Sequence, residues 1–176
     1  MLLTALGFNV TLLSARVAGT EGKLSPEFDH LTLQVDLDHS WLADVGFGES
    51  FVEPLSFADG LEQQDPAGSF RLVRNVDRWR VERRQRDNTW QPQYEFSLPP
   101  RQLSDFYERC EYHQTSPQSH FVQNRICSLA TPEGRVTLSG MRLIVTSHGQ
   151  KEERELTSDA EWRCALQDHF GIIFDA

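Results

Sequence analysis

The amino-acid sequence predicts an α+β protein in which short antiparallel strands occupy most of the chain and a few helices separate them. Three observations support this fold class. Short alternating runs at residues 69–75, 78–86 and 94–98 recur at the spacing typical of a barrel or sandwich. The pair Pro99 and Pro100 then ends this series, and an apolar helical face follows it. The C-terminal part repeats the strand pattern and closes with a capped helix.

The composition describes a globular chain and excludes several classes of function. With 176 residues, of which 39% are apolar, the chain has enough material for a packed core in one large or two small domains. A net charge of -9 argues against general nucleic-acid binding. No apolar run approaches the roughly 20 residues of a membrane span. We therefore expect neither a nucleic acid nor a membrane as a partner, and no residues have the spacing of metal ligands.

The cysteines predict a reducing compartment. Cys110, Cys127 and Cys164 are odd in number and widely spaced, with no CxxC motif and no secretory signal. The cytoplasm is therefore the expected location. Each cysteine occupies a position where a small apolar residue would serve, and none has the surroundings of an activated nucleophile.

The first residues predict the end of a helix. Residues 1–6 are apolar at helical spacing and stop at Gly7, and no capping residue precedes them. So short a helix is unstable alone, and the chain is therefore expected to open inside an element. Residues 8–17 then alternate as a strand, and residues 19–26 form a loop.

Residues 30–48, HLTLQVDLDHSWLADVGFG, carry the strongest functional signal. Apolar and polar residues alternate on both sides of a short turn, which predicts an antiparallel hairpin. The first strand has two faces, one with Leu31, Leu33 and Val35 and the other with His30, Thr32 and Gln34. If Val35 pairs near Trp41, the register places Asp44 on the His30 face. The Asp44 carboxylate then reaches the His30 imidazole.

An aspartate between two apolar strand residues is costly to bury unless another group shares its charge, and a histidine N–H is a suitable partner. His30 and Asp44 are therefore candidates for the base and the orienting acid of a nucleophilic triad. The following run, Gly46-Phe47-Gly48, lets the backbone pass close to a bound group and places one aromatic ring there. A purely structural hydrogen bond within one strand pair is the alternative interpretation.

The middle of the chain is expected to hold a loop at residues 51–65 before the three strands named above. Arginines crowd the first two of these strands, and they are Arg71, Arg74, Arg78, Arg80, Arg83, Arg84 and Arg86. This pattern predicts the solvated face of two strands. An anion site for a phosphorylated cofactor is the alternative.

A connecting helix and a second group of elements follow the proline pair. One helical face carries Leu103, Phe106, Tyr107 and Cys110, and the helix ends before Pro117. Residues 121–130 and 135–139 predict a hairpin around the turn Thr131-Pro132-Glu133-Gly134. Residues 141–147 add a strand, and His148-Gly149 a turn. Ser158 and Glu161 form a capping box for a helix that carries Trp162, Leu166 and Phe170 and ends at Gly171.

Almost the whole chain resembles the arylamine N-acetyltransferase family. The resemblance rests on LGFNVTLLSARV, HLTLQV, LADVGFG followed by Pro54-Leu55, SPQSHFVQNRICSLATPEGRVTL, and LTSDAEWRCALQDHFGI. It implies the papain-like cysteine-triad superfamily, with an N-terminal helical domain, an antiparallel β-barrel, and a small α/β lid domain joined to the barrel by a helix. Residues 1–7 would be a remnant of the helical domain, 8–98 the barrel, 99–115 the connecting helix and 116–176 the lid.

The resemblance also implies roles for individual residues. His30 and Asp44 match the histidine and aspartate of a Cys-His-Asp triad. The substrate-binding positions that it implies are Phe47, Gly48, Val17 and, from the lid, Phe121. Acetyl-CoA is implied as the co-substrate, and a small aromatic amine, N-hydroxyarylamine or hydrazine as the acceptor.

The sequence departs from the family pattern at the nucleophile. In the family the cysteine lies in an RGGxCxE motif shortly before the LGF segment, a place that falls upstream of Met1. We therefore expect a fragment that is inactive alone and that associates through the surface left by the missing domain. The alternatives are an amide synthase of the same superfamily that releases a polyketide from its carrier, and a non-catalytic module that binds CoA or a partner.

Overall fold

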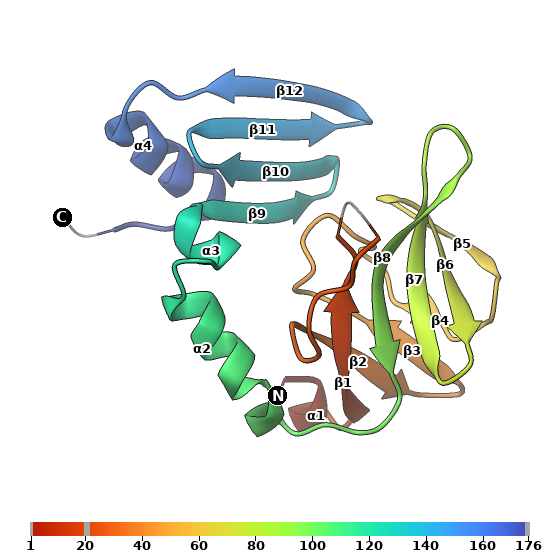
Figure 1. Ribbon diagram of the computed structural model, residues 1–176. Helices are drawn as coiled ribbons and strands as arrows, with labels where there is room; N and C mark the ends of the chain where they lie inside the picture. The colour runs from red at the N-terminus through yellow and green to blue at the C-terminus, as the bar shows by residue number, and fades with distance from the viewer. Residues whose placement is uncertain (1, 20–21, 175–176) are drawn as a thin grey trace. The chain divides into compact units, whose positions relative to one another are not determined.

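The computed structural model describes residues 2–19 and 22–174 (Figure 1). The chain consists of two compact units, Met1–Cys110 and Glu111–Ala176, and the boundary falls inside helix α2 (Tyr107–Thr115). Within the described ranges, no helix has the length and apolar character needed to cross a bilayer. Met1 and part of the predicted 19–26 loop lie outside these ranges. The domain bounds taken from the family resemblance stay a prediction.

The first unit consists mainly of one antiparallel sheet of eight strands, in the order β4-β3-β2-β1-β8-β7-β6-β5 (Figure 1). Its elements are α1 (Leu2–Ala5), β1 (Asn9–Val17), β2 (His30–Asp36), β3 (Ser40–Ala43), β4 (Leu55–Ser56), β5 (Glu62–Asp65), β6 (Gly68–Asn75), β7 (Arg78–Arg84), β8 (Trp90–Ser97) and the 3₁₀ turn η1 (Leu103–Phe106). The sheet curves until β4 contacts β6, and a bridge joins Asp59 to Leu72. This nearly closed sheet confirms the predicted antiparallel barrel in its coarse form.

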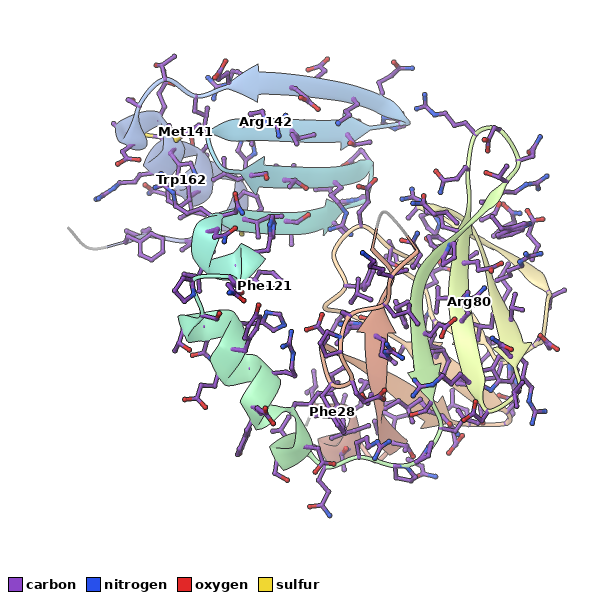
Figure 2. The ribbon with its side chains drawn as sticks, viewed as in Figure 1. Phe28, Arg80, Phe121, Met141, Arg142 and Trp162 are labelled. Carbon is purple, nitrogen blue, oxygen red and sulfur yellow. The ribbon has the colours of Figure 1, made fainter. Side chains whose placement is uncertain are left out.

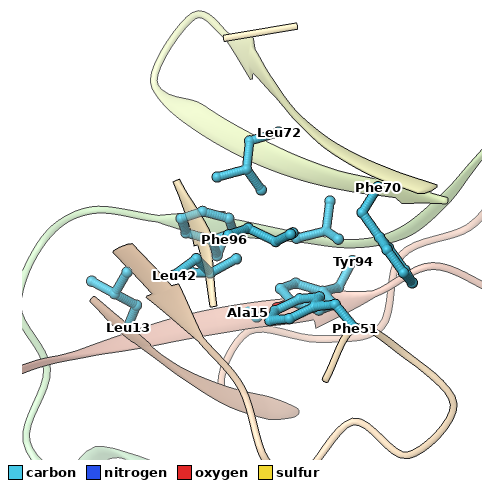
Figure 3. Close-up of a cluster of buried hydrophobic side chains, with 10 residues drawn as sticks. Leu13, Ala15, Leu42, Phe51, Phe70, Leu72, Tyr94 and Phe96 are labelled. Carbon is cyan, nitrogen blue, oxygen red and sulfur yellow. The ribbon is translucent and has the colours of Figure 1, made fainter. Parts of the chain in front are cut away.

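The core of the first unit lies inside this curved sheet (Figure 3). Its buried residues are Leu13, Ala15, Leu42, Phe51, Leu55, Phe70, Leu72, Val81, Tyr94 and Phe96. On β2, Thr32 is fully buried opposite Leu13, and His30 lies opposite Ala15. Burial does not follow the predicted alternation of β2, because Thr32 on its polar face and Val35 on its apolar face are both buried. Leu31 is only half-buried.

The prediction of a loop at residues 51–65 is wrong in part, because β4 and β5 lie there. The sequence of β5 is EQQD, which has no apolar residue and therefore no hydrophobic period. The side-chain amide of Gln63 holds it to β4 by accepting from Ser56 N at 2.7 Å and donating to Ser56 O at 3.0 Å.

The arginine-rich strands form ion pairs across the sheet. Arg71 lies opposite Glu82, with its Nη2 2.7 Å from Glu82 Oε2. Arg80 lies opposite Glu95, with its Nη2 2.6 Å from Glu95 Oε1. Glu82 and Glu95 are largely buried beneath these guanidinium groups. Since neighbouring strands supply carboxylates to these arginines, the charged face of two strands is confirmed and the phosphate interpretation has no support.

The second unit is a four-stranded antiparallel sheet in the order β12-β11-β10-β9, covered on one face by α4 (Figure 1). Its elements are the end of α2, α3 (His120–Gln123), β9 (Ile126–Thr131), β10 (Gly134–Ser139), β11 (Arg142–Ser147), β12 (Gln150–Glu155) and α4 (Asp159–Phe170). Helix α4 begins at Ser158, whose hydroxyl accepts from Glu161 N, and ends at Gly171 with φ +66°. It buries Trp162 and Leu166 against the sheet.

Two predictions for the later elements are wrong, and one strand is missed. Residues 121–123 belong to α3 rather than to a strand, because Ser119 caps a short helix there. Strand β12 is missed because its sequence, QKEERE, has no apolar residue and therefore no hydrophobic period. In the predicted apolar helix only Phe106 is buried, whereas Leu103, Tyr107 and Cys110 are exposed.

Candidate active site

His30 and Asp44 come together on the hairpin of β2 and β3. Val35 pairs with Trp41 in the predicted register. His30 Nε2 lies 2.6 Å from Asp44 Oδ2, so the predicted contact is confirmed. The two side chains are only 11% and 1% exposed. The pair is therefore shielded from water at the start of one strand and just beyond the end of the next.

Asp44 keeps its charge although it is buried. Burial alone would raise its pKa, but hydrogen bonding and the charge of His30 outweigh this effect, and the pKa is lowered. The other carboxylate oxygen, Oδ1, accepts from the backbone N–H groups of Gly46 at 3.1 Å and Phe47 at 3.2 Å. The Tyr94 hydroxyl is a further hydrogen-bond partner. An ionised Asp44 is thus held as a fixed acceptor for His30.

The position of Asp44 leaves one nitrogen of His30 available. When Nε2–H donates to Asp44, Nδ1 carries the lone pair of the neutral ring. Among the described residues, no hydrogen bond engages Nδ1. The ring is packed edge-on against Phe47 and Tyr94, with centroids 5.3 Å and 5.2 Å away. This arrangement fixes an oriented imidazole whose Nδ1 can accept a proton.

Tyr94 is the site residue that sequence reasoning missed. It lies on β8, is fully buried, and its hydroxyl is 3.4 Å from Thr32 Oγ1, which in turn donates to Ala43 O at 3.2 Å. Burial first, and the charge of Asp44 second, raise the pKa of Tyr94, so the phenol stays protonated. Tyr94 follows His30 by a long stretch of chain, and only pairing between β1 and β8 brings it to the dyad.

Of the predicted substrate-binding residues, three lie in the first unit and one lies in the second. The Phe47 ring lies beside His30, tilted at 45° to the Tyr94 ring with the two centroids 5.0 Å apart. Val17 pairs with Tyr94 on the neighbouring strand, and Gly48 has φ +91°, in the left-handed region that favours glycine. Phe121 belongs to the second unit, where its ring contacts His113 at 5.1 Å. The roles of these residues in substrate binding stay predictions.

The cysteines do not provide an activated thiol in the described part of the chain. Burial raises the pKa of the half-buried Cys127 thiol, which disfavours the thiolate. Cys110 and Cys164 are exposed, so the prediction that each cysteine replaces a small apolar residue is wrong for these two. No group of three or more metal-ligating side chains occurs among the described residues.

The second unit has a groove of about 530 Å³ beside α3, β9 and α4. It is lined by Phe121, Val122, Gln123, Asn124, Arg125, Ile126, Cys127, Asp159, Trp162, Arg163, Leu166, Ile172 and Phe174. The Arg125 guanidinium lies 4.5 Å above the Trp162 ring and pairs with Asp159 at 3.2 Å. The groove is thus mainly apolar and its described charges are partly paired.

Comparison with known proteins gives a consistent result over the full length of the chain. A family model described as N-acetyltransferase matches residues 1–176. The pineal gland isozyme of arylamine N-acetyltransferase from Gallus gallus is 32% identical, over 98% of this chain and 68% of the relative. Arylamine N-acetyltransferase from Escherichia coli K12 is also 32% identical, over 98% of this chain and 63% of the relative.

Solved structures agree with the sequence relatives. Arylamine N-acetyltransferase from Salmonella typhimurium superposes with a TM-score of 0.90 at 31% identity, over 97% of this chain and 63% of that one. The enzyme from Mycobacterium marinum in complex with CoA gives 0.88 at 30% identity, over 97% and 65%. The chain therefore spans 63% to 68% of the length of these proteins. With its whole length matched in this way, the chain belongs to the arylamine N-acetyltransferase family.

Proposed function

We propose that this protein transfers an acetyl group from acetyl-CoA to an arylamine, N-hydroxyarylamine or hydrazine, with His30 as general base and Asp44 as the residue that orients it. The observation that carries the proposal is the buried 2.6 Å contact of His30 Nε2 with Asp44, which leaves Nδ1 free. The names of the relatives and the CoA complex of the Mycobacterium marinum neighbour support the choice of reaction and co-substrate.

The proposed chemistry follows from thiol reactivity. A cysteine thiol beside His30 gives its proton to Nδ1, and the resulting thiolate attacks the carbonyl carbon of the acetyl thioester. The C–S bond to CoA breaks, and CoA leaves as a thiol after taking the proton from His30. The acceptor amine then attacks the carbonyl carbon of the acetyl-cysteine and gives a proton to His30; the C–N bond forms, the C–S bond to the cysteine breaks, and the leaving thiolate takes the proton back from His30. Asp44 stabilises the imidazolium in both halves of this ping-pong sequence.

We propose that the nucleophilic cysteine lies upstream of Met1 in the whole protein. The raised pKa of Cys127 supports this view, because a raised pKa lowers the thiolate fraction. The acceptor would lie against Phe47, with Val17 and Gly48 at the same pocket, and Phe121 of the second unit stays a predicted substrate-binding residue. Three cysteines outside any disulfide among the described residues suit the reducing cytoplasm, where we place the reaction.

The decisive experiment adds the proposed upstream nucleophile to the chain. The 176-residue chain should show no more acetyl transfer than its His30→Ala variant, whereas the chain joined to its upstream sequence should be active. In the restored protein, Asp44→Asn should reduce turnover by roughly 10⁴-fold without unfolding the barrel, because it presents the wrong histidine tautomer. Acetylation of Cys110, Cys127 or Cys164, or a restored protein indifferent to Asp44→Asn, would contradict the proposal.

A non-catalytic module that binds CoA or a partner is the second candidate, and the groove of the second unit favours it. Calorimetric titration of the 176-residue chain with CoA distinguishes the two functions. Binding that Trp162→Ala abolishes and His30→Ala leaves unchanged would favour the module. The amide synthase alternative has no specific support in the structure.

A further inference from the structure

Phe28 has an unusual backbone conformation two residues before His30. Its φ of +66° lies in the left-handed region, which a bulky L-residue rarely adopts. The Phe28 N–H donates to Oγ of the fully buried Ser14 at 2.8 Å. Its ring packs edge-on against Phe106 with centroids 5.4 Å apart, and the Arg101 guanidinium lies 5.3 Å above it (Figure 2). Contacts on both the backbone and the ring therefore hold this conformation in place.

Asp29, the residue between Phe28 and His30, is bound to helix α2. Arg109 Nε donates to Asp29 Oδ1 at 3.0 Å, and a terminal nitrogen of the same guanidinium donates to the same oxygen. The side chain of Arg109 is 20% exposed and that of Asp29 is 13% exposed, so water screens the pair weakly. A charge-assisted contact of this kind is strong and directional. It connects the first turn of α2 to the residue adjacent to the candidate base.

Glu27 supplies a third attachment, to the barrel wall. Its carboxylate accepts from Arg78 Nη2 of β7 at 3.0 Å, and both side chains are 28% exposed. Glu27 is thus bound to β7, Phe28 to β1 and η1, and Asp29 to α2. We name Glu27, Phe28 and Asp29 with their contacts the histidine clamp.

The clamp holds the backbone that enters His30 from its N-terminal side, where strand pairing begins only at His30 itself. Pairing of His30 with Ala15 and the bond to Asp44 hold the residue from the sheet. On the N-terminal side the chain arrives from a loop, which Ser25 ties to β1, and the clamp holds the three residues between Pro26 and His30. A general base must hold its orientation within a narrow range, because a small displacement of the ring lowers the rate of proton transfer.

We propose that Phe28 and the Asp29–Arg109 ion pair are positioning residues that set the orientation of the His30 imidazole and couple it to α2. The catalytic consequence rests on the proposed function, whereas the coupling itself concerns only the geometry of the chain. Arg109 does not touch the reacting atoms and acts through Asp29 and the backbone of His30. Loss of the clamp should therefore change the state of the His30 ring while the barrel stays folded.

The test uses nuclear magnetic resonance of the 176-residue chain with labelled histidine. The proton on His30 Nε2 should give a low-field resonance that exchanges slowly with water, because it is buried against Asp44. Arg109→Gln and Phe28→Gly should each accelerate this exchange by roughly tenfold or more, and Arg109→Lys should give a smaller change because it keeps the charge. The matched control is Arg84→Gln, which removes an equivalent charge pair with Glu62 away from the clamp and should leave the resonance unchanged.

Circular dichroism identifies any variant that fails to fold. If Arg109→Gln unfolds the unit, Phe28→Gly decides the question, since glycine adopts a positive φ without strain. An unchanged His30 resonance and exchange rate in either folded variant would overturn the proposal, as would an equal effect of Arg84→Gln. Failure of acetyl transfer in the restored enzyme, with the resonance responding as expected, would contradict the proposed function and leave the clamp established.

Discussion

At the scale of single residues, the site depends on how Asp44 is solvated. A carboxylate that is almost fully buried would normally take up a proton, yet three types of donor surround this one: an imidazole, two backbone amides and a phenol. These donors replace water and hold the pKa of Asp44 below its ordinary value. A structural hydrogen bond would need only one such donor, so the number of donors favours a group that must remain charged.

The lowered pKa of Asp44 makes stability depend on pH in a defined direction. A depressed folded-state pKa gives stability that is present above the ordinary pKa and is lost as the pH falls through the folded value. We expect the free energy of unfolding of the wild type to exceed that of Asp44→Asn near neutral pH, and the gap to shrink below about pH 4. Urea unfolding at several pH values measures it. Asp77→Asn, in an exposed turn, is the control. A gap that does not vary with pH would contradict the expectation.

Tyr94 should support the dyad through its hydroxyl. Tyr94→Phe keeps the buried ring and removes the donor to Asp44, while Thr32 retains its bond to Ala43 O. We expect a loss of about 1 kcal/mol in the free energy of unfolding, and faster exchange of the His30 Nε2 proton. Urea unfolding and nuclear magnetic resonance check the two effects. An unaltered His30 resonance would show that Tyr94 only fills space.

At the scale of elements, tight turns decide which strand pairs form. Gly134 opens β10 with φ +157°, and an ideal Cβ there would lie 2.2 Å from the Thr146 carbonyl oxygen on β11. Only glycine lets these two backbones approach so closely. In contrast, Gly149 in the next turn has φ +77° and no atom within 4 Å of an ideal Cβ.

This difference predicts unequal effects of two alanine substitutions in the second unit. Gly134→Ala should destabilise its sheet by roughly 2–4 kcal/mol, because the backbone must move to admit the methyl group. Gly149→Ala should cost about 1 kcal/mol from backbone strain alone. Hydrogen exchange of the β10 and β11 amides measures both. Equal destabilisation by the two substitutions would mean that the close approach of the backbones at Gly134 does not determine the cost of adding a methyl group.

At the scale of the whole molecule, the two units have separate hydrophobic cores. Leu42 is fully buried in the first core and Leu138 in the second, and each cluster draws its buried residues from one unit. A core that is local to its unit should unfold with that unit. The histidine clamp and the dyad both lie in the first unit.

We therefore expect core substitutions to act on one unit at a time. Leu138→Ala should destabilise the second unit by roughly 2–5 kcal/mol and leave amide exchange in residues 2–110 unchanged, and Leu42→Ala should have the opposite pattern. Hydrogen exchange followed by mass spectrometry resolves the two units. A uniform increase of exchange along the chain in either variant would show that the units unfold together.

The sequence by itself determined the parts of this protein that depend on short-range rules. Period-two alternation predicted the hairpin and its register, so the contact of His30 with Asp44 followed from residues fourteen apart. The capping box at Ser158 and the left-handed Gly171 defined α4 in the same local way. The family motifs identified the barrel, because LGFNVTLLSARV and HLTLQV cover β1 and β2 and LADVGFG begins in β3.

Only the tertiary structure decided which groups complete the site. Tyr94 reaches the dyad through the pairing of β1 with β8, and Arg109 reaches Asp29 from a distant helix, and no sequence period encodes such contacts. The structure also buries Thr32 on the polar face of β2, because its hydroxyl can donate there to Ala43 O. Charged edge strands such as β12 form because a neighbour offers backbone partners, a cause that hydrophobic patterning does not record.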